Sequence, residues 1–475
     1  MRKKLFINGE WIESQQYADL MAPYSEEKIA EIPQASEQEV DAAIDAAYNN
    51  REVMAKLTAY EKAEILEKVA NLLKENRLKA AQIIALESSK PLKFSLGEVD
   101  RTVETYKFAA EEAKRIHGEM IPLDAAKNGM NRLGYTLREP VGVVAAITPF
   151  NFPMNLVAHK LGPAIAAGNT IVLKPASQTP LSAYFIAELL EEAGLPKGAL
   201  NVVTGSGRLV GDRLVMSEKV SMITFTGSPE VGIGIRNKAG LKKVSLELGS
   251  NAGLIIDEGV NLDKIIPKCV IGAFSNQGQV CISLQRIYIH ESLLESFTEK
   301  FKEATEKLVL GDPMDAKTDL SSLISRKEQE RAKSWIDEAA KEGGQVITGG
   351  SIKCDILLPT AIVGVDPHAK VSCQEVFAPI VIINPIKNVD EGIDYINDSK
   401  YGLQAGIFTK DINTAFHASK RLEVGGVIIN DIPTYRVDQM PYGGVKESGN
   451  TREGLKYTIE EMTEMKLVIW NQEQY

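Results

Sequence analysis

The chain has 475 residues, of which 44% are apolar and 25% are charged, and its formal net charge at pH 7 is −10. This acidic balance argues against a basic nucleic-acid-binding surface and against attraction to a negatively charged membrane. The length exceeds what one hydrophobic core usually supports, so we expect two or three domains in one globular protein.

The first residues, MRKKLFINGEWIES, are basic, but polar residues interrupt them before the apolar core of a signal peptide can form. The densest apolar runs, such as residues 141–147, are far shorter than the roughly 20 residues that span a bilayer. The four cysteines have no zinc-ligand spacing, and the five histidines form no HExxH motif. We therefore expect a cytoplasmic protein with no bound metal and with neither a membrane nor a nucleic acid as partner.

Helical and strand-like patterns alternate along the chain and predict α/β architecture with largely parallel sheets. A helix is expected to begin at Thr58, because Glu61 completes a capping box, and Ile65 and Val69 then lie on one face. In residues 141–228, short apolar strands end in Gly, Ser, Thr or Pro and are separated by helices. This pattern is typical of an open sheet that binds a nucleotide at the carboxyl ends of its strands.

A second alternation of helices and strands begins near residue 250 and predicts another α/β domain that faces the first. Two further stretches, residues 138–142 and 465–470, look like strands that lie outside both cores. We expect these strands to act as oligomerisation arms in a homodimer or homotetramer.

The stretch FSNQGQVCIS at residues 274–283 places Cys281 shortly after Gly278. A thiol is a good nucleophile once it is ionised; here the glycine permits a close backbone approach, and neighbouring amides can stabilise developing negative charge. Considered alone, this cysteine is better explained as an inert buried residue, because free cysteine is among the most buried residue types.

Two residues that follow or end predicted strands are further catalytic candidates. Asn151 lies in a turn rich in proline and aromatic residues, where its amide could donate to an oxyanion or simply satisfy its own backbone. Glu247 precedes small residues, where a desolvated carboxylate could act as a general base or be an ordinary solvated side chain. The stretch FTGSPEVG at residues 225–232 suits a pyrophosphate at a helix N-terminus, although it is not the GxGxxG fingerprint.

Together these stretches resemble the aldehyde dehydrogenase superfamily over essentially the whole chain, and most of all its lactaldehyde and non-phosphorylating glyceraldehyde-3-phosphate dehydrogenase branch. The motifs that carry the resemblance are PFNFP from residue 149, LKPASQTPLSA from 173, FTGSPEVG from 225, ELGSNAG from 246, NQGQVC from 276, QEVFAP from 374 and MPYGGVKESG from 440. The resemblance implies an α/β fold with a Rossmann-like cofactor domain, a catalytic domain and a small β oligomerisation arm. The implied boundaries are residues 1–120, 141–249 and 448–461 for the cofactor domain, 250–447 for the catalytic domain, and 121–140 and 462–475 for the arm.

The resemblance also implies NAD(P)-dependent oxidation of an aldehyde to a carboxylic acid. Cys281 would attack the aldehyde carbon to form a thiohemiacetal, and Asn151 with the Cys281 backbone N–H would stabilise the oxyanion. After hydride transfer to the nicotinamide, Glu247 would activate the water that hydrolyses the thioester. Lys160 and Glu453 match positions linked to proton relay from this base, although a structural salt bridge explains them equally well.

The cofactor expected from the resemblance is NAD or NADP. NAD-preferring members often carry a glutamate at the position of residue 177, which accepts hydrogen bonds from the ribose 2′-OH and repels a 2′-phosphate. This chain has Ser177, which does neither strongly, so we predict that NADP is accepted. The residues expected around the cofactor are Ile147, Thr148, Pro149, Phe150, Lys174, Ser177, Gly207, Gly227, Ser228, Glu375 and Phe377.

The expected substrate is a short hydroxylated or anionic aldehyde such as lactaldehyde, glyceraldehyde-3-phosphate or a semialdehyde. Arg436 could clamp an anionic tail through its guanidinium, or it could form a structural ion pair with Asp438 or Asp431. His159 could also face the substrate, or it could be a packing residue.

Three alternatives compete with this interpretation. A CoA-acylating dehydrogenase would share the first half-reaction, but it must keep water away from the thioester, which a general base at Glu247 does not favour. A catalytically retired structural or binding homologue is disfavoured because Cys281, Asn151 and Glu247 are intact. A cysteine hydrolase is disfavoured because no histidine falls in a recognisable thiol-partner motif.

Overall fold

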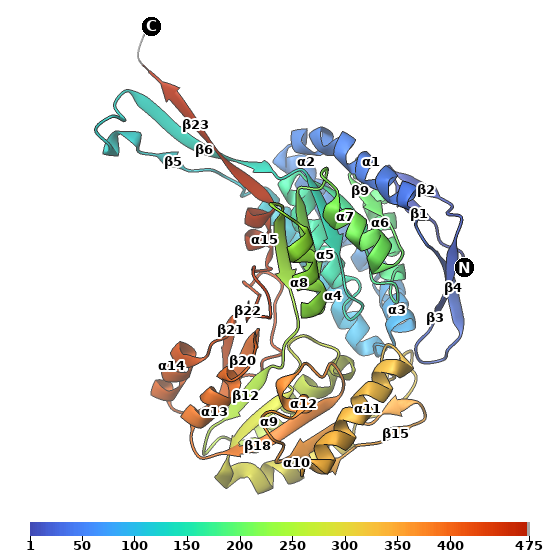
Figure 1. Cartoon of the computed structure of the whole chain (residues 1–475), viewed down its shortest axis with the longest axis vertical. Coiled ribbons are helices and arrows are strands. Elements are labelled where there is room, and N and C mark those ends of the chain that lie inside the picture. The colour runs from blue at the N-terminus through green and yellow to red at the C-terminus, as the bar shows by residue number, and fades with distance from the viewer. Residues whose placement is uncertain (473–475) are drawn as a thin grey trace.

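The structure is a computed structural model that describes residues 1–472. Two largely parallel sheets, each covered by helices on both faces, form the body, and a β arm projects from it (Figure 1). This arrangement confirms the predicted α/β class. Residues 473–475, which fall within the expected oligomerisation arm, lie outside the described residues.

The first sheet contains the strands predicted between residues 141 and 228. Strands β7 to β11 pair in parallel, so their carboxyl ends lie along one edge. In spatial order the sheet consists of β11 (Lys243–Glu247), β10 (Met222–Thr226), β7 (Val143–Ile147), β8 (Thr170–Lys174), β9 (Leu200–Val202), β1 (Leu5–Ile7) and β2 (Glu10–Ile12).

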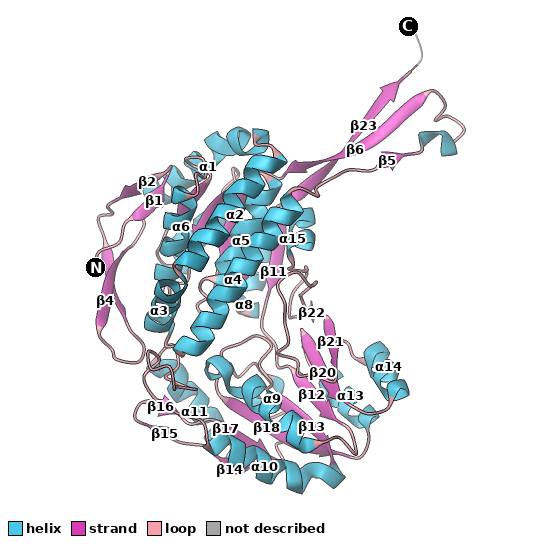
Figure 2. Ribbon diagram, turned by 180° about the vertical axis from the view of Figure 1, so that it is seen from behind, coloured by secondary structure: helices cyan, strands magenta, loops and turns pink. Residues whose placement is uncertain are grey.

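Helices cover both faces of this sheet. The predicted capping box is confirmed: the Thr58 hydroxyl accepts from the Glu61 backbone N–H, and the Glu61 carboxylate accepts from the Thr58 N–H. The helices on one face, prominent in Figure 2, are α2 (Ala59–Glu75), α3 (Arg77–Ser88), α4 (Leu92–Ala113), α5 (Asn155–Ala167), α6 (Leu181–Glu192) and α15 (Leu455–Glu461). The helices on the other face are α1 (Glu37–Lys56), α7 (Asp212–Met216) and α8 (Pro229–Lys238).

The second sheet confirms the second α/β alternation. Its strands pair in parallel except for β14 at one edge. In spatial order it consists of β14 (Gln345–Thr348), β17 (Thr360–Val363), β18 (Ile380–Ile386), β13 (Arg286–His290), β12 (Gly253–Ile256), β20 (Gln404–Phe408) and β21 (Gly426–Ile429). Its helices are α9 (Leu262–Phe274) and α10 (Leu294–Glu306) on one face, and α11 (Arg326–Lys341), α12 (Lys370–Cys373), α13 (Val389–Asn397) and α14 (Ile412–Arg421) on the other.

The arm is an antiparallel ribbon of β5 (Met120–Ile121), β6 (Arg132–Pro140) and β23 (Thr463–Asn471). It contains the two stretches predicted to lie outside both cores, and Figure 1 shows it extending away from the body. The remaining short strands form pairs, namely β3 (Tyr17–Met21) with β4 (Lys28–Pro33), β15 (Ile352–Lys353) with β16 (Ile356–Leu357), and β19 (Tyr401–Gly402) with β22 (Val445–Lys446). Short helical turns are η1 (Leu123–Ala125), η2 (Gly207–Gly211), η3 (Ser275–Gly278) and η4 (Glu291–Leu293).

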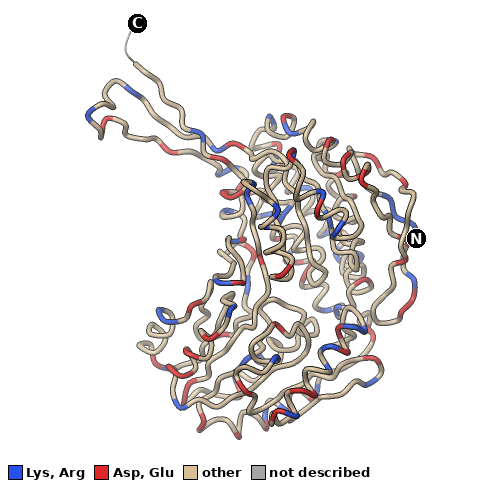
Figure 3. Tube along the Cα trace, in the orientation of Figure 1, with Lys and Arg blue, Asp and Glu red and all other residues tan. Residues whose placement is uncertain are grey.

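Charged residues are distributed over the whole chain. Figure 3 shows Lys and Arg interspersed with Asp and Glu along both sheets and the arm, so the net charge of −10 is spread rather than gathered in one block. Within residues 1–472, no helix has both the length and the apolar character needed to cross a bilayer.

Candidate active site

A cavity of about 520 Å³ lies between the two sheets and receives residues from both. The carboxyl ends of β7, β10 and β11 supply one wall, as expected for a ligand site on an open parallel sheet. The loop before β13 and segments near residues 375 and 436 supply the other wall. The cavity brings together the predicted catalytic residues Asn151, Glu247, Cys281 and Glu453.

The turn before Cys281, the predicted nucleophile, has an unusual backbone. Asn276, Gln277 and Gly278 are consecutive residues in the left-handed region, with φ of 50°, 56° and 68°. A Cβ atom on Gly278 would lie 2.2 Å from the carbonyl oxygen of Ala378, so only glycine fits there. The close backbone approach predicted for Gly278 is therefore present, and it orients the following segment so that Cys281 lines the cavity.

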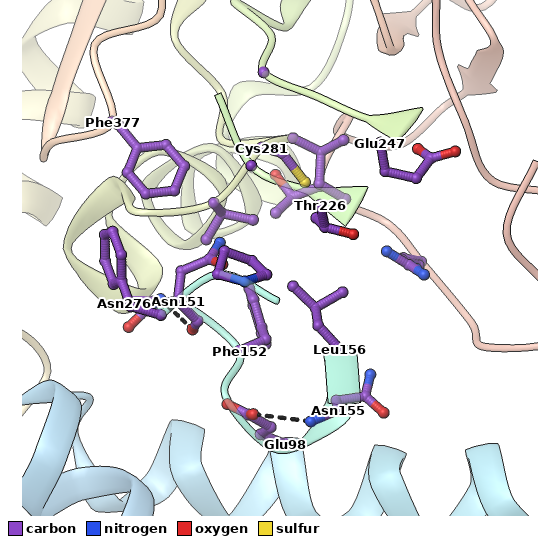
Figure 4. Close-up of a pocket in the computed structure, with 18 of the residues that line it drawn as sticks. Glu98, Asn151, Phe152, Asn155, Leu156, Thr226, Glu247, Asn276, Cys281 and Phe377 are labelled. Atoms are coloured by element: carbon purple, nitrogen blue, oxygen red, sulfur yellow. Dashed lines mark hydrogen bonds between the residues drawn. The ribbon is translucent and has the colours of Figure 1, made fainter. Parts of the chain in front are cut away.

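Side-chain amides compensate for the strained backbone of this turn. Gln277 Nε2 donates to the carbonyl oxygens of Ser89 (2.9 Å) and Ser322 (2.8 Å). Asn276 Nδ2 donates to the carbonyl oxygen of Asn151 at 3.1 Å, a contact that is visible in Figure 4. The turn before Cys281 is thus tied directly to the loop that carries the predicted oxyanion donor.

The Cys281 side chain is half-buried, and its sulfur lies 2.8 Å from the hydroxyl oxygen of Tyr442. Burial raises the pKa of the Cys281 thiol to about 11, although the Tyr442 hydrogen bond and the Arg436 guanidinium both act to lower it. In Figure 4 the sulfur lies between the strand end that carries Glu247 and the loop that carries Asn151. A thiol in this position can reach a substrate within the cavity.

Asn151 is buried, with 4% of its surface exposed. Its Nδ2 donates to the Gln279 carbonyl oxygen at 2.9 Å, while its Oδ1 has no hydrogen-bond partner among residues 1–472. An amide nitrogen carries two hydrogens, so one N–H of Asn151 stays available for a ligand oxygen.

The buried carboxylate of Glu98 fixes the backbone that directly follows the Asn151 loop. Glu98 is 2% exposed, and its Oε1 accepts from the backbone N–H groups of Met154 (2.9 Å) and Asn155 (3.2 Å) at the start of α5. Its Oε2 pairs with Lys90, whose Nζ lies 3.7 Å from the centre of the Phe152 ring. No sequence motif pointed to Glu98, because the backbone N–H groups from which it accepts lie 56 and 57 residues further along the chain.

Glu247 ends β11, as predicted, and is 5% exposed. Its Oε2 has no hydrogen-bond partner within residues 1–472, and its Oε1 accepts from the Thr451 hydroxyl at 3.4 Å. Burial and the nearby Glu453 raise the pKa of Glu247 well above its usual value, while Arg436 and Lys160 act in the opposite direction. A desolvated carboxylate of this kind can take a proton from water near neutral pH.

Lys160 and Glu453 form the predicted salt bridge beside Glu247, with Nζ and Oε1 3.7 Å apart. Lys160 also donates to the Thr224 hydroxyl at 3.1 Å, and burial lowers its pKa. Burial alone would raise the pKa of Glu453, but the cationic groups around it, above all Arg436, lower it to about 2. Glu453 is therefore held as a carboxylate, and the proton-relay role stays a prediction.

Arg436 lines the cavity, but the ion-pair partners expected from the sequence were wrong. Its Nη2 lies 2.7 Å from Glu453 Oε2, whereas Asp431 pairs with Lys268 and Asp438 pairs with other residues. Proximity in sequence suggested the wrong aspartates, because the chain folds back and brings Glu453 beside Arg436.

Asp438 is 4% exposed and binds a different set of groups. It accepts two hydrogen bonds from Arg101, at 2.7 and 3.2 Å, and one contact of 2.9 Å from His159 Nε2. Burial would raise the pKa of Asp438, but His159 and Arg101 hold it well below its usual range. His159 is 1% exposed and is absent from the described lining of the cavity, whereas Arg101 belongs to that lining.

The predicted cofactor residues divide into two groups. Those that line the cavity are Pro149, Phe150, Gly227, Ser228, Glu375 and Phe377. The others, at or after the carboxyl ends of β7, β8 and β9, are Ile147, Thr148, Lys174, Ser177 and Gly207. The Phe150 and Phe377 rings meet edge to face, with centroids 5.7 Å apart.

Polar groups in both sets fit a dinucleotide. Ser228 precedes α8 and its side chain makes no capping hydrogen bond within the described chain, so the first N–H groups of that helix can receive a phosphate. Lys174 is buried, which lowers its pKa to about 8, and its Nζ donates to the Pro175 carbonyl oxygen at 3.3 Å. Burial raises the pKa of Glu375 to about 7, and its Oε1 accepts from the Ser250 N–H.

Tyr442, Arg101 and Glu98 are site residues that sequence reasoning missed. Tyr442 lies inside the motif MPYGGVKESG, so the sequence marked this residue but did not indicate that its hydroxyl contacts Cys281. Arg101 and Glu98 lie on α4, which carries no recognisable motif, and only the packing of α4 against α5 brings them to the site.

A cavity between two α/β sheets that holds a thiol, an amide and a desolvated carboxylate, with polar groups suited to a dinucleotide, suits a dinucleotide-dependent oxidoreductase. The comparisons with known proteins agree. Residues 11–468 match the model of the aldehyde dehydrogenase family, and the chain belongs to that family. It is therefore an NAD(P)-dependent oxidoreductase that acts on aldehydes.

Individual relatives match over nearly the whole chain. A 3-sulfolactaldehyde dehydrogenase of Priestia aryabhattai is 49% identical, over 98% of both chains. A lactaldehyde dehydrogenase of Methanococcus aeolicus is 42% identical, over 98% of this chain and 100% of that one. The crystal structure of a glyceraldehyde-3-phosphate dehydrogenase from Methanocaldococcus jannaschii, complexed with NADP, is 42% identical, covers 96% of this chain and 100% of its own, and has a TM-score of 0.92. The branch predicted from the motifs is thereby confirmed.

Proposed function

We propose that this enzyme oxidises a short aldehyde with a hydroxylated or anionic tail to the corresponding acid. Cys281 is the nucleophile, Asn151 the oxyanion donor and Glu247 the general base. The observation that carries the proposal is that one cavity holds these three groups together with two guanidinium groups, those of Arg101 and Arg436.

In the first half-reaction the Cys281 thiolate attacks the aldehyde carbon, and the carbonyl oxygen becomes an oxyanion. The available N–H of Asn151 and the Cys281 backbone N–H stabilise that charge, a contribution typically worth about 3 kcal/mol of barrier per donor. The oxyanion then collapses to the thioester as a hydride leaves that carbon. NAD(P), which the residues at the ends of β7, β8 and β10 would hold, would supply the acceptor for this hydride.

In the second half-reaction the unpartnered Oε2 of Glu247 takes a proton from a water molecule, which attacks the thioester. The carbon–sulfur bond breaks, its electron pair returns to Cys281, and the acid leaves. Lys160, 3.7 Å from Glu453 and close enough to Glu247 to lower its pKa, supports the proposed path for the proton.

The two arginines support an anionic or hydroxylated tail. A guanidinium binds sulfonate, phosphate or carboxylate through paired hydrogen bonds. The names of the relatives agree, since sulfolactaldehyde, lactaldehyde and glyceraldehyde-3-phosphate all carry a hydroxyl beside the aldehyde carbon, and two of them end in an anion. Both guanidinium groups already pair with a carboxylate, Arg436 with Glu453 and Arg101 with Asp438. Arg101 is the clearer candidate, because 30% of its side chain is exposed, compared with 7% for Arg436. His159, buried behind Asp438, contributes by holding that aspartate beside Arg101.

Matched pairs of aldehydes measured with both nucleotides test the proposal. Each pair compares an anionic substrate with a neutral one of similar length, such as succinic semialdehyde with butanal, or 3-sulfolactaldehyde with lactaldehyde. Arg101→Met should lower kcat/KM about ten-fold or more for the anionic member and leave the neutral member nearly unchanged. An equal loss for both members would refute tail recognition by Arg101.

The proposal extends to cofactor choice, assembly and compartment. Acceptance of NADP is supported by Ser177, whose hydroxyl donates to the Gly205 carbonyl and presents no negative charge, and by the NADP complex of the relative.

A homodimer or homotetramer is supported by apolar side chains that are exposed along the arm. These side chains are Met120, Leu133, Leu137, Met465, Leu467, Ile469 and Trp470. Light scattering, which measures the mass of the assembly, tests this proposal. The two body sheets and the arm support the proposed domain boundaries, and four free cysteines suit the reducing cytoplasm.

A further inference from the structure

Tyr442 places a buried phenol against the sulfur of the proposed nucleophile. The residue is 3% exposed, and its hydroxyl oxygen lies 2.8 Å from Cys281 Sγ. Among residues 1–472 that sulfur is the only hydrogen-bond partner of the hydroxyl. A buried phenol O–H requires a partner, so its hydrogen bond is directed at the sulfur.

The Tyr442 ring is held on several sides. The Arg436 guanidinium lies 3.7 Å from the ring centre, stacked on its face. The backbone of Tyr442 exchanges two hydrogen bonds with Glu453, of 3.0 and 2.6 Å. The ring also packs in a small apolar cluster with Val280 and Ile282, the neighbours of Cys281. The hydroxyl is therefore preorganised toward the sulfur rather than free to rotate into the cavity.

The direction of the hydrogen bond follows from the ionisation of the two groups. Burial raises the pKa of Tyr442 well above its usual value, so the phenol keeps its proton and can donate. A thiolate has no proton and can only accept. The other charged groups that act on the sulfur are Arg436, which favours the thiolate, and Glu375 and Glu247, which oppose it. Tyr442 is thus a neutral donor in a site where two carboxylates oppose ionisation of the thiol.

We propose that Tyr442 is a further catalytic residue, whose hydroxyl donates a hydrogen bond to the Cys281 thiolate and increases the population of the reactive nucleophile. This inference rests on the proposed role of Cys281 as the nucleophile. During attack the sulfur electron pair forms the bond to carbon, and the acceptor for the Tyr442 hydrogen is weakened. When the thioester is hydrolysed, the electron pair returns to sulfur and the hydrogen bond forms again, so Tyr442 assists both steps without transferring its own proton.

The test compares Tyr442→Phe with Tyr435→Phe, a matched removal of a hydroxyl from a half-exposed tyrosine in the same segment. Both changes are made with Cys354→Ser and Cys373→Ser, since these free cysteines are more accessible than the fully buried Cys269 and would also react. The alkylation rate of Cys281 by iodoacetamide is followed across pH by mass spectrometry. Thiolate absorbance in the ultraviolet, measured against the Cys281→Ser counterpart of each variant, gives the ionised fraction directly.

We expect Tyr442→Phe to lower the alkylation rate near neutral pH about ten-fold and to shift the thiolate titration to higher pH, while Tyr435→Phe matches the parent. Replacing Tyr442 by 3-fluorotyrosine, a nearly isosteric and more acidic donor, should shift both readouts in the opposite direction. An unchanged titration in both Tyr442 variants would overturn the inference. Neither readout requires turnover, so this result would leave the nucleophile proposal standing, whereas full turnover of Cys281→Ser would refute that proposal instead.

Discussion

The two halves of the cavity are built on different principles. On the proposed acylation side, Cys281 and Asn151 are uncharged at rest, and backbone geometry and amide hydrogen bonds hold them in place. On the proposed deacylation side, Glu247 lies among buried charges, and Glu453, Arg436 and Lys160 all act on its pKa. The first half controls position, and the second controls proton affinity.

The difference matches what each step requires. Attack on a carbonyl depends on the distance and angle between the reacting atoms. The turn at Gly278, where only glycine fits, and the hydrogen bond from Asn276 to the Asn151 backbone both restrict this geometry. Activation of water depends on a base whose pKa is near the working pH, which burial beside charges can provide. The Tyr442–Cys281 contact is an exception, because it places proton control within the acylation half.

The largest expected effect comes from removing the acylation half altogether. Cys281→Ser should lower NAD(P)H formation at least about a thousand-fold, because no other group can form the thiohemiacetal. Nucleotide binding, measured by fluorescence, should be retained. The matched control is Cys373→Ser, another incompletely buried free thiol, which should be close to wild type.

Glu247→Gln separates the two halves. Acylation should proceed and release about one NAD(P)H per site in a burst, after which steady turnover should fall about a hundred-fold, because the glutamine cannot deprotonate water. Stopped-flow absorbance measures both phases, and the exposed Glu258→Gln is the control. Undiminished steady turnover would remove Glu247 from the deacylation half.

The raised pKa of Glu247 predicts a pH dependence that belongs only to deacylation. The base must be ionised, so the deacylation rate should fall as pH drops through a pKa well above the usual value for glutamate. Single-turnover decay of the thioester, measured across pH, should show this acid limb in the wild type. The limb should be absent in Glu247→Gln, and its persistence there would assign it to another group.

Ser177→Glu changes a residue outside both halves, so the relative rates of acylation and deacylation should stay unchanged. A carboxylate near the adenosine ribose repels a 2′-phosphate, so the ratio of kcat/KM with NADP to that with NAD should fall by more than about ten-fold. The ratio of burst to steady rate with saturating NAD should stay the same. An unaltered nucleotide ratio would contradict the placement of Ser177 at the ribose.

Glu98→Gln is the smallest and most specific perturbation. Loss of the carboxylate loosens the start of α5 and unpairs Lys90, so the Asn151 loop should be less well positioned. We expect the burst rate to fall about five-fold while nucleotide affinity is retained. Glu104→Gln, an exposed change on the same helix, is the control, and an equal loss in both variants would argue against a positioning role.

Much of the fold, and the meeting of the three proposed reacting groups in one cavity, could be predicted from sequence because the signals are local. The Thr58 capping box, the alternation of strands and helices, and Glu247 at a strand end all depend on a few neighbouring residues. The short turn around Gly278 also indicated a position that requires glycine. The carbonyl oxygen that a side chain there would clash with belongs to the distant Ala378. The family motifs then linked these local signals to one reaction.

The amino-acid sequence by itself determined the α/β class, the family and the three groups that carry the proposed chemistry, since each lies in a short motif with its own backbone requirement. Only the tertiary structure decided which distant side chains surround those groups. Tyr442 meets Cys281 across 161 residues, and Arg436 pairs with Glu453 instead of the nearer aspartates. Such contacts depend on how helices and loops pack against one another, and local periodicity and spacing do not contain that information.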